Sequence, residues 1–189
     1  MLKFDPKSGT FALKVTGFSA QGGTLRVTTD RFVIRSDELT WSEEAGRFVA
    51  RTPNVQIIVS TDGRTVSAVV ENTGTVPFTI SEIAVVFFPP KSFSPPLHCK
   101  EHLQYVHHLS CNSAGVRLVG RKTVWSEGDE RSYMVTVFHH PHTGDSLLIG
   151  SLPPSQTLSG VDVLHSAGHR EGDFGFSLVA ECQAEIQPG

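Results

Sequence analysis

The residues best suited to chemistry are nine histidines, several of which lie close together in the sequence. Four fall between His98 and His108, and three more fall within residues 139–142. Imidazole is a common ligand of zinc, which needs three or four ligands converging at about 2 Å. Adjacent residues of a strand point to opposite faces, so His139 and His140 cannot bind one metal without a bulge. We therefore predict no metal site and no cofactor.

A cysteine nucleophile or a pair of catalytic carboxylates is the next kind of site to consider. Cys111 lies near His107 and His108 in the sequence, but no flanking signature of a cysteine enzyme accompanies it. The chain also has no nucleophile elbow, phosphate-binding loop or dinucleotide fingerprint. Carboxylate pairs such as Glu43-Glu44 and Asp129-Glu130 fall in polar turn segments, whereas acid and base partners must oppose each other across a cleft. The sequence thus predicts no catalytic residue.

Bulky aromatic residues offer a different chemistry, because a ring face can stack on a sugar. Trp41, Trp125 and Tyr105 lie near the ends of predicted strands or in loops. The alternative interpretation is that these three side chains are partly buried at the rim of the fold. Both interpretations stay open at the level of sequence.

Composition limits the kind of protein that positions these residues. The chain has 189 residues, a net charge of -3 and no long basic run, which argues against a nucleic-acid partner. No apolar run approaches the ~20 residues of a membrane span, and the first ten residues lack the apolar core of a signal peptide. Three cysteines without a CxxC pair are typical of free thiols in a reducing compartment. We predict a cytoplasmic protein with no membrane partner and no disulfide.

Residue alternation predicts an all-β fold. Valine is far commoner than alanine, and branched side chains suit a pleated sheet. Apolar and polar residues alternate with period two in most of the segments between turn signals. We expect a large two-sheet antiparallel sandwich of at least ten strands with little or no helix. The strands are expected at residues 10–18, 24–28, 31–36, 48–51, 55–61, 65–71, 76–88, 115–119, 132–139, 146–151, 158–164 and 174–184.

Turn residues divide these strands. Asp62-Gly63 is the strongest hairpin signal in the chain, and Gly22-Gly23, Thr29-Asp30 and residues 143–145 also predict turns. Residues 97–110 are ambiguous, because apolar side chains recur there at spacing three and a short helix is an alternative to a strand. A proline-rich crossing spans residues 89–96. Because either half alone would leave open sheet edges, we expect a single domain over residues 1–189.

Two segments of the second half carry a family resemblance. The first runs from Leu103 to Ser113 (LQYVHHLSCNS), and the second joins Ser132–Phe138 through His140–Gly144 to the run Ser146–Leu152 (SLLIGSL). Together they resemble the N-terminal β-sandwich domain of glycoside hydrolase family 36, the α-galactosidases and raffinose-synthase-like proteins. In the first segment, His108-Leu109 stands where the family has His-Gly.

The resemblance implies a galactose-mutarotase-like supersandwich that is noncatalytic. In the family, both catalytic aspartates lie in a (β/α)₈ barrel that follows the sandwich. The parent protein would then be a glycoside hydrolase, and this chain would pack against the barrel and edge its sugar site. The partners implied are a carbohydrate, the barrel and, for an exposed face, a second copy of the chain. The residues expected at the carbohydrate edge or docking face are Tyr105, His107, His108, Asn112 and Trp125.

The competing hypothesis is a stand-alone module that binds a protein or a carbohydrate. Residues 66–88 resemble the strand-Asn-x-Gly-strand pattern of Ig-like domains, with Asn72 and Gly74 at the turn. A second alternative concerns Leu103, Val106 and Leu109, which either fill the core or form an exposed apolar patch. An enzyme that uses a histidine metal site is a third hypothesis, and metal analysis of the purified protein would test it.

Overall fold

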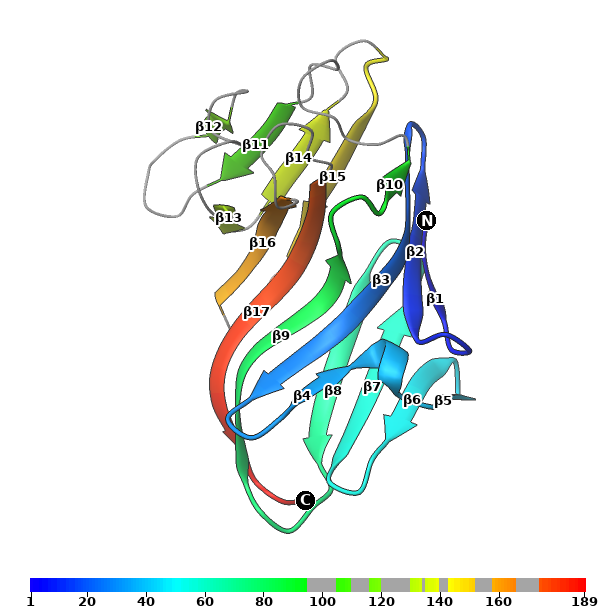
Figure 1. The fold of residues 1–189 in the computed structure, drawn as a ribbon, viewed down its shortest axis with the longest axis vertical. Coiled ribbons are helices and arrows are strands. Elements are labelled where there is room, and N and C mark those ends of the chain that lie inside the picture. Colours follow the sequence, from blue (N-terminus) through cyan, green and yellow to red (C-terminus); the bar gives the residue numbers. More distant parts are fainter. Residues whose placement is uncertain are drawn as a thin grey trace.

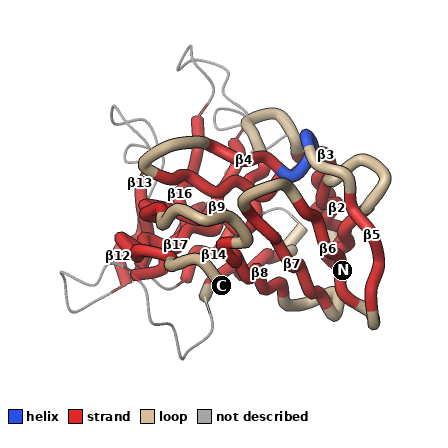
Figure 2. Tube along the Cα trace, turned by 90° about the horizontal axis from the view of Figure 1, so that it is seen from below, coloured by secondary structure: helices blue, strands red, loops and turns tan. Residues whose placement is uncertain are grey.

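The computed structural model describes residues 1–94, 105–109, 116–119, 130–133, 135–139, 143–151, 158–165 and 174–189. Most of these described residues lie in strands, so the predicted all-β sandwich with little helix is confirmed. Figure 2 shows the one short helix found among the described residues. This element is η1, a 3₁₀ turn at Ser36–Glu38.

A large sheet forms one layer of the sandwich (Figure 1). Its strands follow the order β1-β2-β3-β9-β17-β16-β13, and β4 and β10 each pair with β3. Strand β17 runs along most of the length of the molecule. The bounds are β1 Leu2–Asp5, β2 Thr10–Val15, β3 Phe18–Thr29, β4 Val33–Arg35, β9 Phe78–Phe88, β10 Phe93–Ser94, β13 Glu130–Tyr133, β16 Leu158–His165 and β17 Phe174–Ile186.

Two separate four-stranded sheets form the other layer. The lower sheet, at the bottom of Figure 1, has the order β5-β6-β7-β8, and the upper sheet has the order β12-β11-β14-β15. All of their strand pairs are antiparallel. The bounds are β5 Trp41–Glu44, β6 Arg47–Arg51, β7 Val55–Thr61, β8 Val66–Asn72, β11 Tyr105–Leu109, β12 Val116–Val119, β14 Val135–His139 and β15 Ser146–Gly150.

A row of phenylalanines across one face of the large sheet joins the three sheets. Phe4 pairs with Phe11 across β1 and β2, and Phe88 pairs with Phe176 across β9 and β17. At one end of the row, the Phe4 ring lies 4.9 Å from Trp41 of the lower sheet. At the other end, the Phe176 ring lies 6.0 Å from Phe138 of the upper sheet. Because both small sheets contact this face, their buried residues belong to one hydrophobic cluster.

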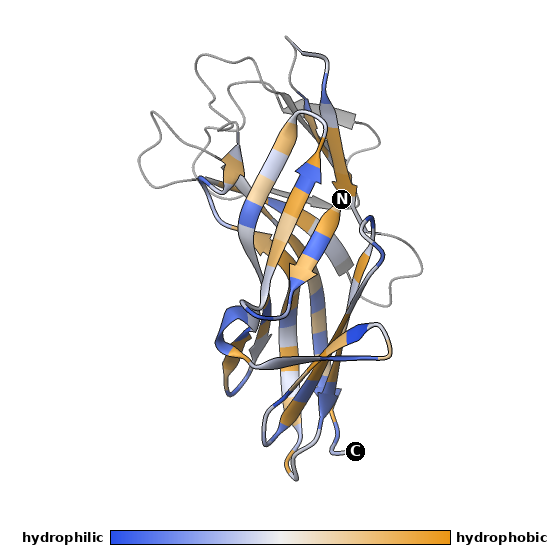
Figure 3. Cartoon of the chain, turned by 90° about the vertical axis from the view of Figure 1, so that its right-hand side faces the viewer, coloured by the Kyte–Doolittle hydropathy of each residue, from blue (hydrophilic) through white to orange (hydrophobic). Residues whose placement is uncertain are grey.

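A glycine in β3 is needed where this row crosses the strand. Gly23 pairs with Phe11, and a Cβ on Gly23 would lie 2.7 Å from the ring of Phe88. Any side chain at this position would therefore displace the ring. Along most strands, hydrophobic and hydrophilic residues alternate as Figure 3 shows, so that one side of each strand is buried.

Local hairpin signals predicted the lower sheet best. Strand β7 has the predicted bounds, and β8 begins one residue later than expected. The turn between them contains Gly63 at a φ of 88°, a value that favours glycine. Asp62 accepts the backbone N–H of Arg64 at 2.8 Å and that of Thr65 at 2.7 Å. The predicted Asp62-Gly63 hairpin is thus confirmed.

Two local predictions are wrong, and one open alternative is decided. Gly22-Gly23 does not turn the chain; both residues lie inside β3 beside a register shift, and the turn falls at Gly17, whose φ is 75°. The single strand expected at residues 132–139 is two strands, β13 in the large sheet and β14 in the upper sheet. The helix alternative for residues 97–110 fails at Tyr105–Leu109, which form strand β11. The alternation of apolar and polar residues predicts which face of a strand is buried, but it does not predict which sheet the strand joins.

Part of the proline-rich segment lies within the described residues. After β9, the N–H of Ser92 bonds to the carbonyl of Pro89, and Lys91 has a φ of 72°. The chain then enters β10, where the buried Phe93 pairs with Ala20. Residues 95–96 lie outside the described residues. No helix in the described part of the chain is long and apolar enough to cross a membrane.

Candidate functional site

The upper sheet holds three of the predicted site residues. Tyr105, His107 and His108 lie on β11, which runs between β12 and β14. The Cα register places Tyr105 opposite His139, and His107 opposite Val137. The backbone of β11 is described and its side chains are not. The segment is therefore a central strand of a sheet rather than a loop or helix.

The outer face of the upper sheet is polar at one end. We use this name for the side of β14 and β15 that carries Val135, Val137, His139, Ser146 and Leu148. His139 pairs with Ser146 across the two strands, and His139 Nδ1 lies 2.8 Å from Ser146 Oγ in a hydrogen bond. In the same row, Tyr105 of β11 lies opposite His139 in the Cα register. The row thus brings the imidazole of His139 and the hydroxyl of Ser146 together at one end of the sheet, next to the register position of Tyr105, and both groups can hydrogen-bond to a sugar hydroxyl.

An exposed leucine lies in the next outward row. Leu148 of β15 pairs with Val137 and is 66% exposed, the largest exposed fraction among the large hydrophobic residues that the structure describes. Its neighbours Leu147 and Ile149 are buried in the core. The alternation along β15 therefore leaves one apolar side chain on the surface.

The two adjacent histidines of β11 hold positions in different rows. His108 pairs with Thr136, whose side chain is fully buried and whose Oγ1 has no hydrogen-bond partner among the described residues. Neighbouring positions of a strand belong to opposite faces of its sheet. His107 and His108 therefore do not share a face, and only the position of His107 belongs to an outward row.

The remaining aromatic and polar candidates have different outcomes. Asn112 and Trp125 lie outside the described residues, as does Leu103. Trp41 is not an exposed ring: it is 8% exposed, its Nε1 donates to the carbonyl of Ser36 at 2.8 Å, and it packs against Phe4. Its alternative role as a core residue is the one that the structure supports.

Cysteine and metal chemistry has little support in the described part of the chain. Cys182 on β17 is free, and burial together with the neighbouring charge of Glu82 raises the pKa of its thiol. Cys99 and Cys111 are outside the described residues. Among the residues that are described, no three His, Cys, Asp or Glu side chains gather as a metal site requires.

The outer face of the lower sheet carries an ion pair. Glu44 and Arg51 form a two-pronged contact, in which Arg51 Nη2 donates to Glu44 Oε2 at 2.9 Å. Ser42 also donates to Glu44, at 2.8 Å. The guanidinium bonds and the Ser42 bond lower the pKa of Glu44 to about 2. The Glu44–Arg51 pair lies across the position of Val49 on β6. The Val49 side chain is 5% exposed, although it does not belong to the core cluster.

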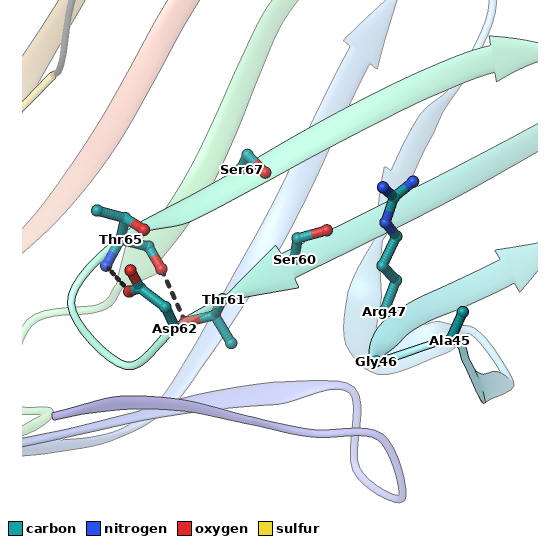
Figure 4. A pocket seen from close by; sticks show the side chains of 8 residues that line it. All are labelled: Ala45, Gly46, Arg47, Ser60, Thr61, Asp62, Thr65 and Ser67. Carbon is teal, nitrogen blue, oxygen red and sulfur yellow. Dashed lines mark hydrogen bonds between the residues drawn. The ribbon is translucent and has the colours of Figure 1, made fainter.

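A shallow polar hollow of about 480 Å³ lies beside this ion pair (Figure 4). Two hairpin turns form its ends: Ala45-Gly46 between β5 and β6, and Asp62–Thr65 between β7 and β8. Ala45 and Gly46 have φ values of 50° and 75°, the left-handed pair that a two-residue hairpin turn needs. The lining consists of Ala45, Gly46, Arg47, Ser60, Thr61, Asp62, Thr65 and Ser67.

Arg47, Ser60 and Ser67 stand on the same side of the lower sheet (Figure 4). Ser60 pairs with Ser67, and the pairing of Phe48 with Val59 brings Arg47 beside Ser60. Arg47 faces Glu44 in the register of β5 and β6, but the Glu44 carboxylate is taken by Arg51 and Ser42. No ion pair joins Arg47 to a carboxylate in the part of the chain that the structure describes.

Sequence reasoning missed this hollow. Its two turns carry the Ala-Gly and Asp-Gly signals, but the hydroxyl residues on β7 and β8 resemble ordinary solvent-facing strand positions. Only strand pairing brings Arg47 beside Ser60 and Ser67. Comparisons of the chain with protein-family models, with curated proteins and with solved structures found no match.

Proposed function

We propose that this chain is the noncatalytic β-sandwich domain of an α-galactosidase-like glycoside hydrolase. In this proposal, the outer face of the upper sheet edges a carbohydrate site and the domain packs against a catalytic barrel. The proposal rests on the resemblance of residues 103–113 and 132–152 to the family, together with one structural observation. That observation is the outward row in which Tyr105 and the hydrogen-bonded pair His139–Ser146 hold consecutive register positions.

The chemistry of this row suits a sugar better than an ion. An aromatic ring offers a face for the C–H groups of a pyranose, and the imidazole and hydroxyl groups both donate and accept hydrogen bonds. The row contains no Asp, Glu, Lys or Arg side chain. A neutral polyol is therefore the matching ligand.

Titration of the purified chain with galactose and raffinose tests the proposal. Tyr105→Ala is expected to weaken binding roughly five- to tenfold, because the ring contact contributes about 1–1.5 kcal/mol. Arg31→Ala, an exposed change on the large sheet, is the control and should bind as the parent does. Binding that Tyr105→Ala and His139→Ala both leave unchanged would contradict a carbohydrate edge at this row.

A protein-binding module is the second candidate, and the exposure of Leu148 favours it. An apolar side chain on an outward row is a typical element of a protein interface. Under this hypothesis, Leu148→Ser weakens self-association of the chain and leaves sugar binding intact. Sedimentation velocity of the parent and the variant measures this. A reading frame that continues into a barrel would favour the first proposal.

A further inference from the structure

The hollow on the lower sheet has hydrogen-bonding groups that the fold does not use. The guanidinium of Arg47 has no ion pair in the described part of the chain, and neither Ser60 Oγ nor Ser67 Oγ has a hydrogen bond there. All three groups stand on one side of the sheet, in adjacent strands. They form a ready set of donors and acceptors that faces solvent.

Asp62 supplies the complementary acceptor at the end of the hollow. Two backbone N–H groups bond to its Oδ1, and these bonds, that of Thr65 first, lower the pKa of the carboxyl group. The carboxylate thus stays ionised, and it has lone pairs left for other donors. Thr61 is already engaged, because its hydroxyl donates to the carbonyl of Thr65 at 2.8 Å.

The charges of the hollow select the class of ligand. Arg47 and Asp62 both line it and form no ion pair with each other, so the site contains one positive and one negative group at separate places. A dianion such as phosphate would be attracted by Arg47 and repelled by Asp62. A neutral polyol is favoured at both ends, because each hydroxyl can accept from the guanidinium and donate to the carboxylate.

We propose that this hollow is a second saccharide-binding site, in which Arg47, Asp62, Ser60 and Ser67 hydrogen-bond to the hydroxyls of one pyranose unit. Its volume of about 480 Å³ is enough to hold one pyranose unit, in a hollow that is open to solvent. The inference extends the proposed function, since it takes a carbohydrate as the ligand. The hollow is on the lower sheet and the carbohydrate edge is on the upper sheet, so the two sites are separate (Figure 1).

Affinity at this hollow is expected to be weak. The lining has no aromatic ring, so no stacking face is present, and the groups are open to water that competes for their hydrogen bonds. Dissociation constants of roughly a millimolar are the order expected for such a contact. A site of this strength adds to affinity when one longer saccharide engages both sites.

Amide chemical shifts of the isotopically labelled chain, titrated with methyl α-galactoside, test the site and locate it. The inference expects shifts at residues 45–47 and 60–67, and the proposed function expects them at residues 137–139 and 146–148. Shifts only at the upper sheet overturn the second site and keep the proposed function. Shifts only at the hollow keep the second site and overturn the carbohydrate edge. Shifts at neither place overturn both.

Matched arginine variants then test the chemistry. Arg47→Gln should weaken binding at the hollow at least about tenfold, the effect of losing a charge-assisted contact. Arg64→Gln removes the same charge from the neighbouring turn but from a residue that does not line the hollow, and should leave binding unchanged. Equal effects of the two variants would overturn the assignment. Tighter binding of inorganic phosphate than of the galactoside would overturn the ligand class.

Discussion

Ser36 should contribute far more to stability than an average serine. Its side chain is fully buried in η1 and bridges two elements that are distant in the sequence. The N–H of Leu25 on β3 donates to Ser36 Oγ at 2.8 Å, and Ser36 Oγ donates to the carbonyl of Gly9 at 2.5 Å. The change Ser36→Ala removes the hydroxyl and leaves one buried donor and one buried acceptor without a partner.

The magnitude follows from these two groups. Each unsatisfied buried polar group costs about 1–3 kcal/mol, so the two groups together predict a loss of unfolding free energy of about 2–6 kcal/mol. For a chain of this length, a loss of that size lowers Tm by roughly 4–24 °C. The backbones of Gly9 and Ser36 cannot move closer to fill the space that the hydroxyl leaves, because they already touch: a Cβ on Gly9 would lie 2.0 Å from the backbone oxygen of Ser36. The bond from Trp41 to that oxygen involves the backbone and should survive.

Urea unfolding followed by far-UV circular dichroism measures this loss as a lower midpoint with an unchanged slope. The control is Ser42→Ala, which removes a hydroxyl from the exposed side chain of β5 and should change the free energy by no more than about 0.5 kcal/mol. A loss for Ser36→Ala that matches the control would refute the reasoning. It would mean that water or a neighbouring group satisfies both partners.

Three further predictions concern the lower sheet and β17. Because the folded pKa of Glu44 is about 2, below its ordinary value of 4.5, this group stabilises the fold above pH 4.5 and loses that contribution as the pH falls toward 2. When the pH is lowered from 4.5 to 2, the Tm of Glu44→Gln should therefore fall less than the Tm of the parent chain. Equal falls in Tm would contradict this prediction. Ala45 adopts a φ of 50°, which costs an alanine about 1 kcal/mol, so Ala45→Asn should raise the unfolding free energy by about 0.5–1 kcal/mol. A lower urea midpoint would count against this account. In Gly175→Ala, the new Cβ would lie 2.2 Å from the backbone oxygen of Phe88, so a loss of more than about 2 kcal/mol is expected. Gly189→Ala, where the nearest atom is 3.5 Å away, serves as its control in the same denaturation assay, and equal midpoints would argue against the clash.

The candidate sites were predicted unevenly. The sequence and the family resemblance selected Tyr105, His107 and His108 as residues with useful chemistry, but not their geometry. Strand β11 pairs with β14 about thirty positions further along the chain, and this pairing puts Tyr105 beside His139 while it assigns His107 and His108 to opposite faces. The hollow at Arg47 had no sequence signal of its own. Among the described residues, the guanidinium of Arg47 has no ion pair because Glu44, which lies opposite it in the register, bonds to Arg51.

The sequence by itself determined the class of the fold and the local hairpins. Alternation with period two predicts which side chains of a strand are buried, and the Asp62-Gly63 pair predicts β7 and β8, because both signals act between residues close in the chain. Tertiary structure decided which sheet each strand joins. Strands β13 and β14 are separated by one residue and enter different sheets, Gly22-Gly23 continues a strand instead of turning it, and Trp41 is buried against Phe4. Each of these outcomes depends on partners distant in the sequence, and alternation specifies the face of a strand without specifying the neighbour that covers it.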